Sequence, residues 1–146
     1  MDKIYDILIK EHSEVSELIK KATQDDTKNT FNQIKAKLQP HLLGEEELFY
    51  PALEENEELI ELVNHAYDEH EEIKTILQEL DNSSEGDRSW IATVHALDKV
   101  VSHHVEEEEN KVFPAAQKVI SDNQAQEIAK QYAEFSKNFK PQPIMG

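Results

Sequence analysis

Cysteine is absent from this chain of 146 residues, and its absence excludes several kinds of site at once. Disulfide bonds, thiolate metal sites, iron–sulfur clusters and cysteine nucleophiles all require it. Glycine and proline are also scarce, with 3 and 5 residues. A β fold rich in turns needs more of both, so the composition favours long helices with few connections.

Long hydrophobic runs are missing as well. No apolar stretch approaches the roughly 20 residues that a membrane-spanning helix needs. Asp6 interrupts the short apolar run at the start of the chain and no cleavage motif follows, so we expect no signal peptide. The cytoplasm is therefore the default expectation for the location of the protein.

Basic residues are few: 15 Lys and Arg stand against 31 Asp and Glu, giving a formal net charge of −16. A chain this acidic is not expected to bind nucleic acid or an anionic membrane through its general electrostatic field. The excess of acid has two readings. It keeps the protein soluble, or a cluster of glutamates within it offsets bound cations.

What the chain does contain is helical periodicity within a length typical of one domain. Apolar residues recur at steps of three and four over about residues 2–23, 31–51, 59–80 and 90–112, with a shorter segment around 125–139. Pro40 should kink the second segment. We predict an all-α fold, an up-down-up-down four-helix bundle with a short extra C-terminal helix, as one domain over residues 1–139 followed by a tail, 140–146.

The inward face of every long stripe carries polar residues where apolar ones are expected. Each stripe holds one histidine, and two stripes add a glutamate four positions later; the set is His12, His41, Glu45, His70, His104 and Glu108. Residues four apart lie on one face of a helix, about 6 Å apart along its axis. Each His–Glu pair can therefore point at one site in the core.

Burying a bare carboxylate costs several kcal/mol or forces its protonation. Two carboxylates in one core need cations, and imidazole with carboxylate is a suitable ligand set for Fe, Mn or Zn. One histidine on an apolar face is usually a hydrogen-bonded core residue, and one His-x-x-x-Glu pair often lies on a surface. A metal site is favoured because all four stripes carry a histidine on the inward face, and not because of any single residue or pair.

The two halves of the chain also repeat each other. The segment from His41 to Pro51 parallels the segment from His104 to Pro114, with the same spacing from His to Glu and from His to Pro. Glu11-His12 likewise parallels Glu69-His70. Each half is then a helical hairpin, and two hairpins related by an approximate twofold axis would give each of two metals one histidine from each of two helices, with both glutamates as bridges. Such a site leaves coordination positions open for a small molecule.

With these motifs the sequence resembles the hemerythrin-like, or HHE cation-binding, family. The motifs are Glu11-His12, Pro40-His41-x-x-x-Glu45-Glu46, Glu69-His70 and His104-Val105-x-Glu107-Glu108, with the two trailing aromatic-Pro pairs. The resemblance implies a four-helix bundle around two Fe ions, bridged by oxo or hydroxo and by two carboxylates. It also implies binding of O₂, sensing of O₂ or redox state, and handling of iron or NO.

The third helix departs from the oxygen-carrying members, in which a His-x-x-x-His pair supplies a fifth histidine. Ala66 and Lys74 occupy the positions four before and four after His70. The last acid is Glu at His plus four, where the carriers use Asp at plus five. The set of four His and two Glu is similar to bacterial and regulatory members.

Several functions remain open. The first is a metal-binding protein that binds or senses O₂, NO or redox state through two irons, with Zn or Mn as other possible metals. The second is a small oxidase, peroxidase or ferroxidase acting on a ligand such as peroxide, and the third is an iron store or buffer. A plain bundle without metal is the last, and the oligomeric state is unknown.

Neighbouring residues have weaker predictions. Tyr67, one turn before His70, is a candidate to approach the metals as a hydrogen-bond donor or as a weak ligand, with core packing as the alternative. Some glutamates are candidates to orient imidazoles, or else are solvated: Glu11, Glu46, Glu69 and Glu107. Three further histidines fall off the stripes and are expected outside the core: His65, His95 and His103.

Overall fold

A computed structural model describes residues 2–140, and within this range it contains helices and no strand. The all-α prediction is confirmed. The α-helices are α1 (Ile4–Asp25), α2 (Lys28–Gly44), α3 (Tyr50–Glu54), α4 (Ile60–Asp81), α5 (Arg88–Glu107), α6 (Phe113–Val119) and α7 (Asp122–Lys137). A 3₁₀ turn, η2 (Glu57–Leu59), precedes α4.

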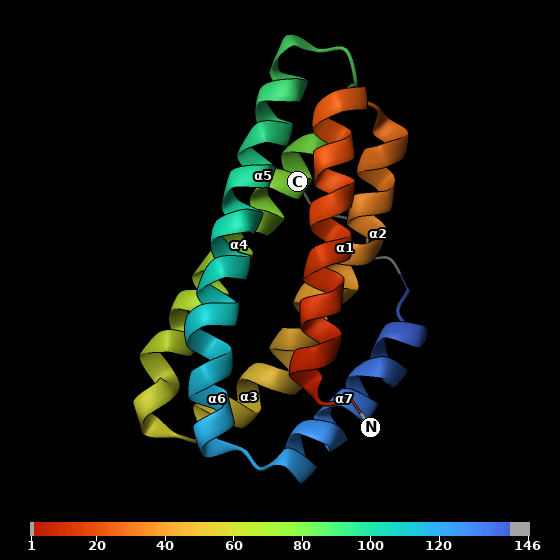
Figure 1. Ribbon diagram of the computed structural model, residues 1–146. Helices are drawn as coiled ribbons and strands as arrows, with labels where there is room; N and C mark the ends of the chain where they lie inside the picture. Colours follow the sequence, from red (N-terminus) through yellow and green to blue (C-terminus); the bar gives the residue numbers. More distant parts are fainter. Residues whose placement is uncertain (1, 141–146) are drawn as a thin grey trace.

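Four long helices, α1, α2, α4 and α5, run side by side (Figure 1). The sequential neighbours α1 and α2, and α4 and α5, pack as hairpins, and α1 packs against α5. Helix α7 lies across one end, where it contacts α1 and α2. It is the helix that the sequence placed around residues 125–139.

Two π-helical segments interrupt the second and fourth long stripes: η1 (Glu45–Phe49) and η3 (Glu108–Val112). Each begins at the glutamate of a His-x-x-x-Glu pair, and in each a proline, Pro51 or Pro114, is the second residue of the α-helix that follows. The second stripe was expected to end near Pro51, but it continues through α3 to Glu54. A π-turn shifts the bonding to i→i+5, which changes the face that the following residues occupy.

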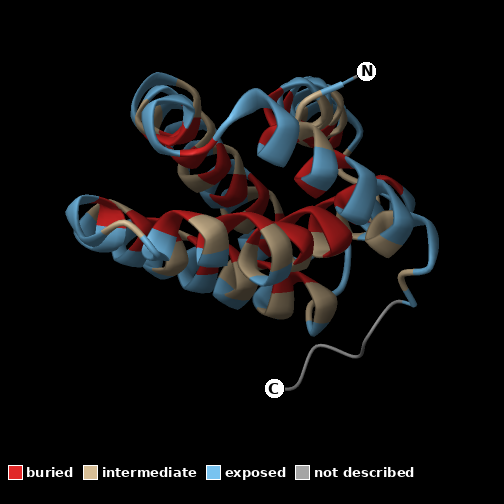
Figure 2. Cartoon of the chain, turned by 90° about the horizontal axis from the view of Figure 1, so that it is seen from below, coloured by how far each residue is buried: buried red, intermediate tan, exposed pale blue. Residues whose placement is uncertain are grey.

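The buried interior consists of two apolar clusters with polar residues between them. Figure 2 shows the buried residues on the sides of the helices that face one another. On α1, Ile4 and Leu8 belong to the first cluster and Val15 and Ile19 to the second. His12 lies between these pairs in sequence. The same change of cluster occurs along α4, where His70 separates buried Val63 and Ala66 from Ile73 and Leu77. Apolar packing therefore shields the polar layer from bulk water along both directions of the bundle.

The predicted tail, 140–146, lies outside the described residues except for Lys140. Within the described part of the chain, no helix is both long enough and apolar enough to cross a membrane. Pro40 is buried inside α2, which continues past it as a single helix.

Candidate metal centre

The polar layer is made of the six side chains that the sequence selected. Their exposed fractions are all 4% or lower, and both glutamates are fully buried. His12 comes from α1, His41 from α2, His70 from α4 and His104 from α5, while Glu45 and Glu108 are the first residues of the two π segments. Each of the four long helical stripes therefore contributes to one buried cluster, as its periodicity required.

The six residues form two overlapping groups, each compact enough for one ion. One group is His12, His41, Glu45 and Glu108, and the other is His70, His104, Glu45 and Glu108; within each group the ligand atoms lie within 4.8 Å of one another. Both groups contain both glutamates. The first takes its imidazoles from the first hairpin and the second takes them from the second hairpin.

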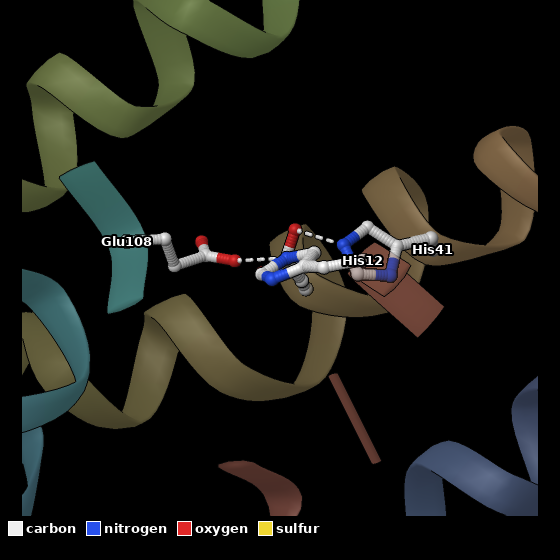
Figure 3. A group of neighbouring side chains, drawn as sticks. His12, His41 and Glu108 are labelled. Atoms are coloured by element: carbon white, nitrogen blue, oxygen red, sulfur yellow. Dashed lines mark hydrogen bonds and ion pairs between the residues drawn. The ribbon is translucent and has the colours of Figure 1, made fainter. Parts of the chain in front are cut away.

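In the first group, His12 Nε2 lies 3.1 Å from Glu108 Oε1, and His41 Nε2 lies 3.2 Å from Glu45 Oε1. Figure 3 shows the carboxylate of Glu108 pointing toward His12, with His41 beside it. Each histidine thus faces a glutamate, and the two imidazole rings lie next to each other, with centroids 4.9 Å apart.

In the second group, the Nε2 atoms of His70 and His104 lie only 3.2 Å apart. His70 Nε2 is also 3.2 Å from Glu45 Oε1, and His104 Nε2 is 3.6 Å from Glu108 Oε2. Both imidazoles therefore turn the same nitrogen toward the shared carboxylates.

A second ring of glutamates, called here the outer carboxylates, binds the other nitrogen of every histidine. The pairs and their Nδ1–O distances are His12–Glu109 at 2.7 Å, His41–Glu11 at 2.8 Å, His70–Glu46 at 2.7 Å and His104–Glu69 at 2.8 Å. A carboxylate is only an acceptor, so each Nδ1 carries the proton. The outer carboxylates fix the ring orientation and the tautomer that leaves Nε2 free for a metal, as in many metal sites.

Sequence reasoning identified three of the outer carboxylates as candidates and missed the fourth. Glu107 was proposed, but it pairs with Lys111 at 3.2 Å and does not reach a core histidine. Glu109 takes the role instead. The internal repeat was the signal that could have found it, because Glu109 follows Glu108 as Glu46 follows Glu45.

Three inner atoms of the cluster lack hydrogen-bond partners among the described residues. His41 Nε2 and both carboxylate oxygens of Glu45 are buried without one. Leaving such groups unpaired costs about 1–3 kcal/mol each, and more when the group is charged. His41 Nε2 lies 3.2 Å from Glu45 Oε1. A cation bound to the imidazole nitrogen and the Glu45 carboxylate would give these unpaired atoms a partner. The residues present fit a pair of metal ions.

The protonation of each histidine in the cluster depends on the charge of the neighbouring carboxylates. Burial by itself lowers the pKa of His41, but the charge of Glu45 and the hydrogen bond to Glu11 raise it to about 10. The pKa of His104 is likewise held above its ordinary value, chiefly by Glu108 against the effect of burial. Without a cation, protons on imidazole are what neutralise the buried carboxylates.

The two shared glutamates differ in their protonation. Burial raises the pKa of the Glu45 carboxyl, but His41 and the surrounding donors hold it well below its ordinary range. Burial and the charge of Glu45 raise the pKa of Glu108. The pair therefore favours one charged and one more readily protonated carboxyl when no ion is bound.

Tyr50 is a buried phenol in contact with the cluster that sequence reasoning missed. Its hydroxyl donates to Glu108 Oε2 at 2.5 Å and lies 3.2 Å from His70 Nε2. Tyr67, the candidate from the sequence, packs edge-on against the Tyr50 ring, and its hydroxyl lies 3.5 Å from the Glu46 carbonyl. Tyr50 follows Glu45 by five residues, and the π-turn, in which its N–H bonds to the Glu45 carbonyl, brings the two onto a common face.

The cluster borders a small cavity of about 10 Å³ with mostly apolar walls. His12, His41 and His104 line one part of it, and the aliphatic side chains around the rest are Val15, Leu38, Leu42, Ile73, Val101 and Val105. A cavity of this volume is close to the minimum for one water molecule. The centre therefore offers room for a molecule of very few atoms and none for a large organic substrate.

This site geometry agrees with what comparisons of the chain with known proteins found. Residues 3–116 match the model of the hemerythrin HHE cation binding domain. The chain belongs to this hemerythrin-like family. The matched segment contains both groups of the buried cluster and ends before α7 begins.

Two relatives extend the comparison. The chain is 28% identical, over 97% of its length and 72% of the relative's length, to an uncharacterized hemerythrin-like protein of Schizosaccharomyces pombe. The crystal structure of a hemerythrin HHE cation binding domain-containing protein of Mycobacterium kansasii superimposes with a TM-score of 0.80 at 24% identity, covering 94% of this chain and 86% of that chain. The second likeness is one of fold.

The remaining histidines lie outside the buried cluster. His65, His95 and His103 are exposed, as the stripes indicated. Lys74, four residues after His70, forms an ion pair with the outer carboxylate of Glu46 at 2.8 Å and not with the inner atoms.

Proposed function

We propose that this protein holds two metal ions, with iron as the leading candidate, and that the centre binds or senses O₂, NO or redox state. One observation carries the proposal: four Nε2 atoms and two carboxylates converge in a dry interior while every Nδ1 is engaged by an outer carboxylate. An inner surface made of lone pairs suits cations and little else.

The proposed ligands are His12 and His41 for one ion and His70 and His104 for the other, with Glu45 and Glu108 shared. In this reading the fold is an up-down-up-down four-helix bundle whose four helices each supply one imidazole, and α7 is an extra helix. Supporting this division, each group combines imidazoles from one hairpin with both carboxylates. Zn or Mn would fit the same ligands.

When bound, two iron ions would supply open coordination positions and redox capacity. The chain's own residues restrict what reaches them. The apolar walls around the small cavity exclude large substrates and favour an uncharged diatomic molecule or peroxide. The Tyr50 hydroxyl holds Glu108 Oε2 and is the nearest phenolic proton to the second group.

A second candidate function is an oxidase, peroxidase or ferroxidase, and Tyr50 is the observation that favours it. Burial and the charges of Glu108 and Glu45 raise the pKa of the phenol, so it retains a proton that it can donate at the centre. An iron store or buffer has no comparable support, because the cavity leaves no volume for more than a few atoms.

The first experiment measures metal content after expression in iron-replete medium. We expect about two ions per chain in the original protein, far fewer in His41→Ala and Glu108→Ala, and no change in the exposed control His95→Ala. Circular dichroism of each variant reports whether the helices persist. Equal metal in all four proteins would refute the ligand assignment.

The second experiment separates binding from turnover. Absorption spectra of the iron-loaded protein are recorded under air, after adding NO and after adding peroxide. A persistent adduct supports binding or sensing, whereas repeated consumption of peroxide with return of the initial spectrum supports an enzyme. A spectrum that responds to neither O₂, NO nor peroxide would contradict both functions.

A further inference from the structure

A second cluster of metal-ligating side chains lies on the surface where α4 and α5 pack together. It consists of His65 and Glu69 on α4 and His103 on α5, with ligand atoms within 4.8 Å of one another. The side chains of the two histidines are 56% and 61% exposed, whereas that of Glu69 is only 11% exposed. Two accessible imidazoles therefore cover one nearly buried carboxylate.

The two oxygens of Glu69 face different neighbours. Oε1 accepts from Nδ1 of His104 at 2.8 Å, so Glu69 is one of the outer carboxylates of the buried cluster. Oε2 faces outward, 3.4 Å from Nε2 of His65 and 3.4 Å from Nε2 of His103. It is buried and has no hydrogen-bond partner among the described residues. Glu69 thus presents a free oxygen to two imidazole nitrogens.

The matching position in the first hairpin has different neighbours. Glu11, the counterpart of Glu69 in the repeat, accepts a hydrogen bond from the hydroxyl of Tyr132 on α7 as well as from His41. Tyr132 is buried and α7 covers that face. In the second hairpin no helix takes this place within the described chain, and His65 and His103 stand there exposed to solvent.

We propose that His65, Glu69 and His103 form a third metal site, at the surface, for a divalent transition-metal ion. The spacing suits such an ion. With metal–ligand bonds of about 2.1 Å, two ligands at a tetrahedral angle lie about 3.4 Å apart, and each imidazole nitrogen lies 3.4 Å from the Glu69 oxygen. Imidazole with one carboxylate selects ions such as Zn²⁺, Ni²⁺ or Cu²⁺ over Ca²⁺ and Mg²⁺.

The surface cluster has the same kind of residue spacing as the buried cluster. His65 and Glu69 are four apart on one helix, the same spacing as His41 and Glu45. Helix α5 then supplies the second imidazole, as α4 and α5 together supply two histidines to the core. Glu107, whose Oε1 lies 3.9 Å from His103 Nε2, stands at the rim, where it pairs with Lys111. Water molecules would complete the coordination of an ion at this exposed position.

The test is equilibrium dialysis of the full chain against Ni²⁺, after its core has been filled with iron and excess iron removed. We expect one Ni²⁺ per chain. His65→Ala and His103→Ala should each weaken this binding by at least about tenfold, as loss of one ligand does. His95→Ala, which removes an exposed histidine of α5 outside the cluster, should bind Ni²⁺ as the original does.

Two results would overturn the proposal: no Ni²⁺ bound by the filled protein, or equal binding by all three variants. The iron content of each sample keeps this test apart from that of the core centre. A chain that holds two irons but no Ni²⁺ contradicts only the surface site. A chain that lacks core iron yet loses Ni²⁺ with His65→Ala contradicts only the core assignment.

Discussion

The two hairpins of this protein carry the same types of buried histidine and glutamate in different surroundings. Glu11 in the first hairpin and Glu69 in the second hold equivalent histidines, yet Tyr132 covers the former and exposed His65 and His103 face the latter. Next to the core, Tyr50 in the first hairpin corresponds to Phe113 in the second. The two halves share the inner side chains of the buried cluster, and the residues around each half differ.

The aromatic difference places unlike chemistry on the two sides of the centre. The Phe113 ring stacks on His12 with centroids 6.0 Å apart and a 2° interplanar angle, and it offers no hydrogen-bonding group. The Tyr50 hydroxyl donates to Glu108 and contacts His70. The two proposed ions therefore have different environments although their protein ligands are of the same types.

The largest expected effect concerns pH and the histidines that both halves share. Because the pKa of His41 is raised to about 10, and those of His70 and His104 are also raised, protons compete with metal well above pH 7. Metal affinity should rise between pH 7 and pH 9, by up to about tenfold per pH unit for each proton displaced. Competition titrations with a chelator measure this.

The metal-free protein should respond in the opposite direction. A raised folded-state pKa stabilises the fold below the ordinary imidazole value of about 6.5, and this stabilisation is lost as pH rises toward 10. Thermal unfolding of the metal-free chain should thus show falling stability over that range. A metal affinity that does not change with pH above 7 would contradict the raised pKa values of these histidines.

The next effect tests why α7 covers only the first hairpin. A Cβ added to Gly44 would lie 2.5 and 2.8 Å from two ring carbons of Tyr132, which is buried and hydrogen-bonded to Glu11. Gly44→Ala should therefore cost about 2 kcal/mol through overpacking, lowering the melting temperature by about 6 °C. Thermal unfolding followed by circular dichroism measures this change in melting temperature.

The matched control for Gly44 lies in the other hairpin. Glu107 occupies the equivalent position in the repeat, and Glu107→Ala should change stability by less than about 0.5 kcal/mol because its carboxylate makes ion pairs with the exposed Lys111 and His103. In the double variant Gly44→Ala/Tyr132→Ala, the clash is gone and the two losses should not add. Strict additivity would show that Gly44 has no role in seating Tyr132.

The smallest effect makes the two halves alike. Tyr50→Phe copies Phe113 onto the first hairpin and removes the donor to Glu108 Oε2, a hydrogen bond to a charged group worth about 1.5 kcal/mol. We expect metal affinity to fall by about tenfold and the absorption spectrum of the iron-loaded protein to shift. Tyr67→Phe, which alters a hydroxyl outside the cluster, should change neither, and an identical response of both variants would remove Tyr50 from the centre.

Helical periodicity explains which residues of the buried cluster could be predicted from the sequence. Positions three and four apart share a face of an α-helix, so the spacing of His12, His41, His70 and His104 within their stripes was enough to assign them to one interior. The sequence did not identify Tyr50, because in a regular α-helix a residue five positions after Glu45 lies on a different face. The π-turn brings Tyr50 onto the same face as Glu45. Glu109 escaped although the repeat contained its signal.

The sequence by itself determined the all-helical class, the family and the six residues of the buried cluster, because these depend on the spacing of residues within single helices. Only the tertiary structure decided which outer carboxylate holds which imidazole, that Tyr132 reaches Glu11 from 121 residues away, and that His65 and His103 meet over Glu69. Those contacts join different helices, and their register depends on how the helices pack together, which no pattern within one helix specifies.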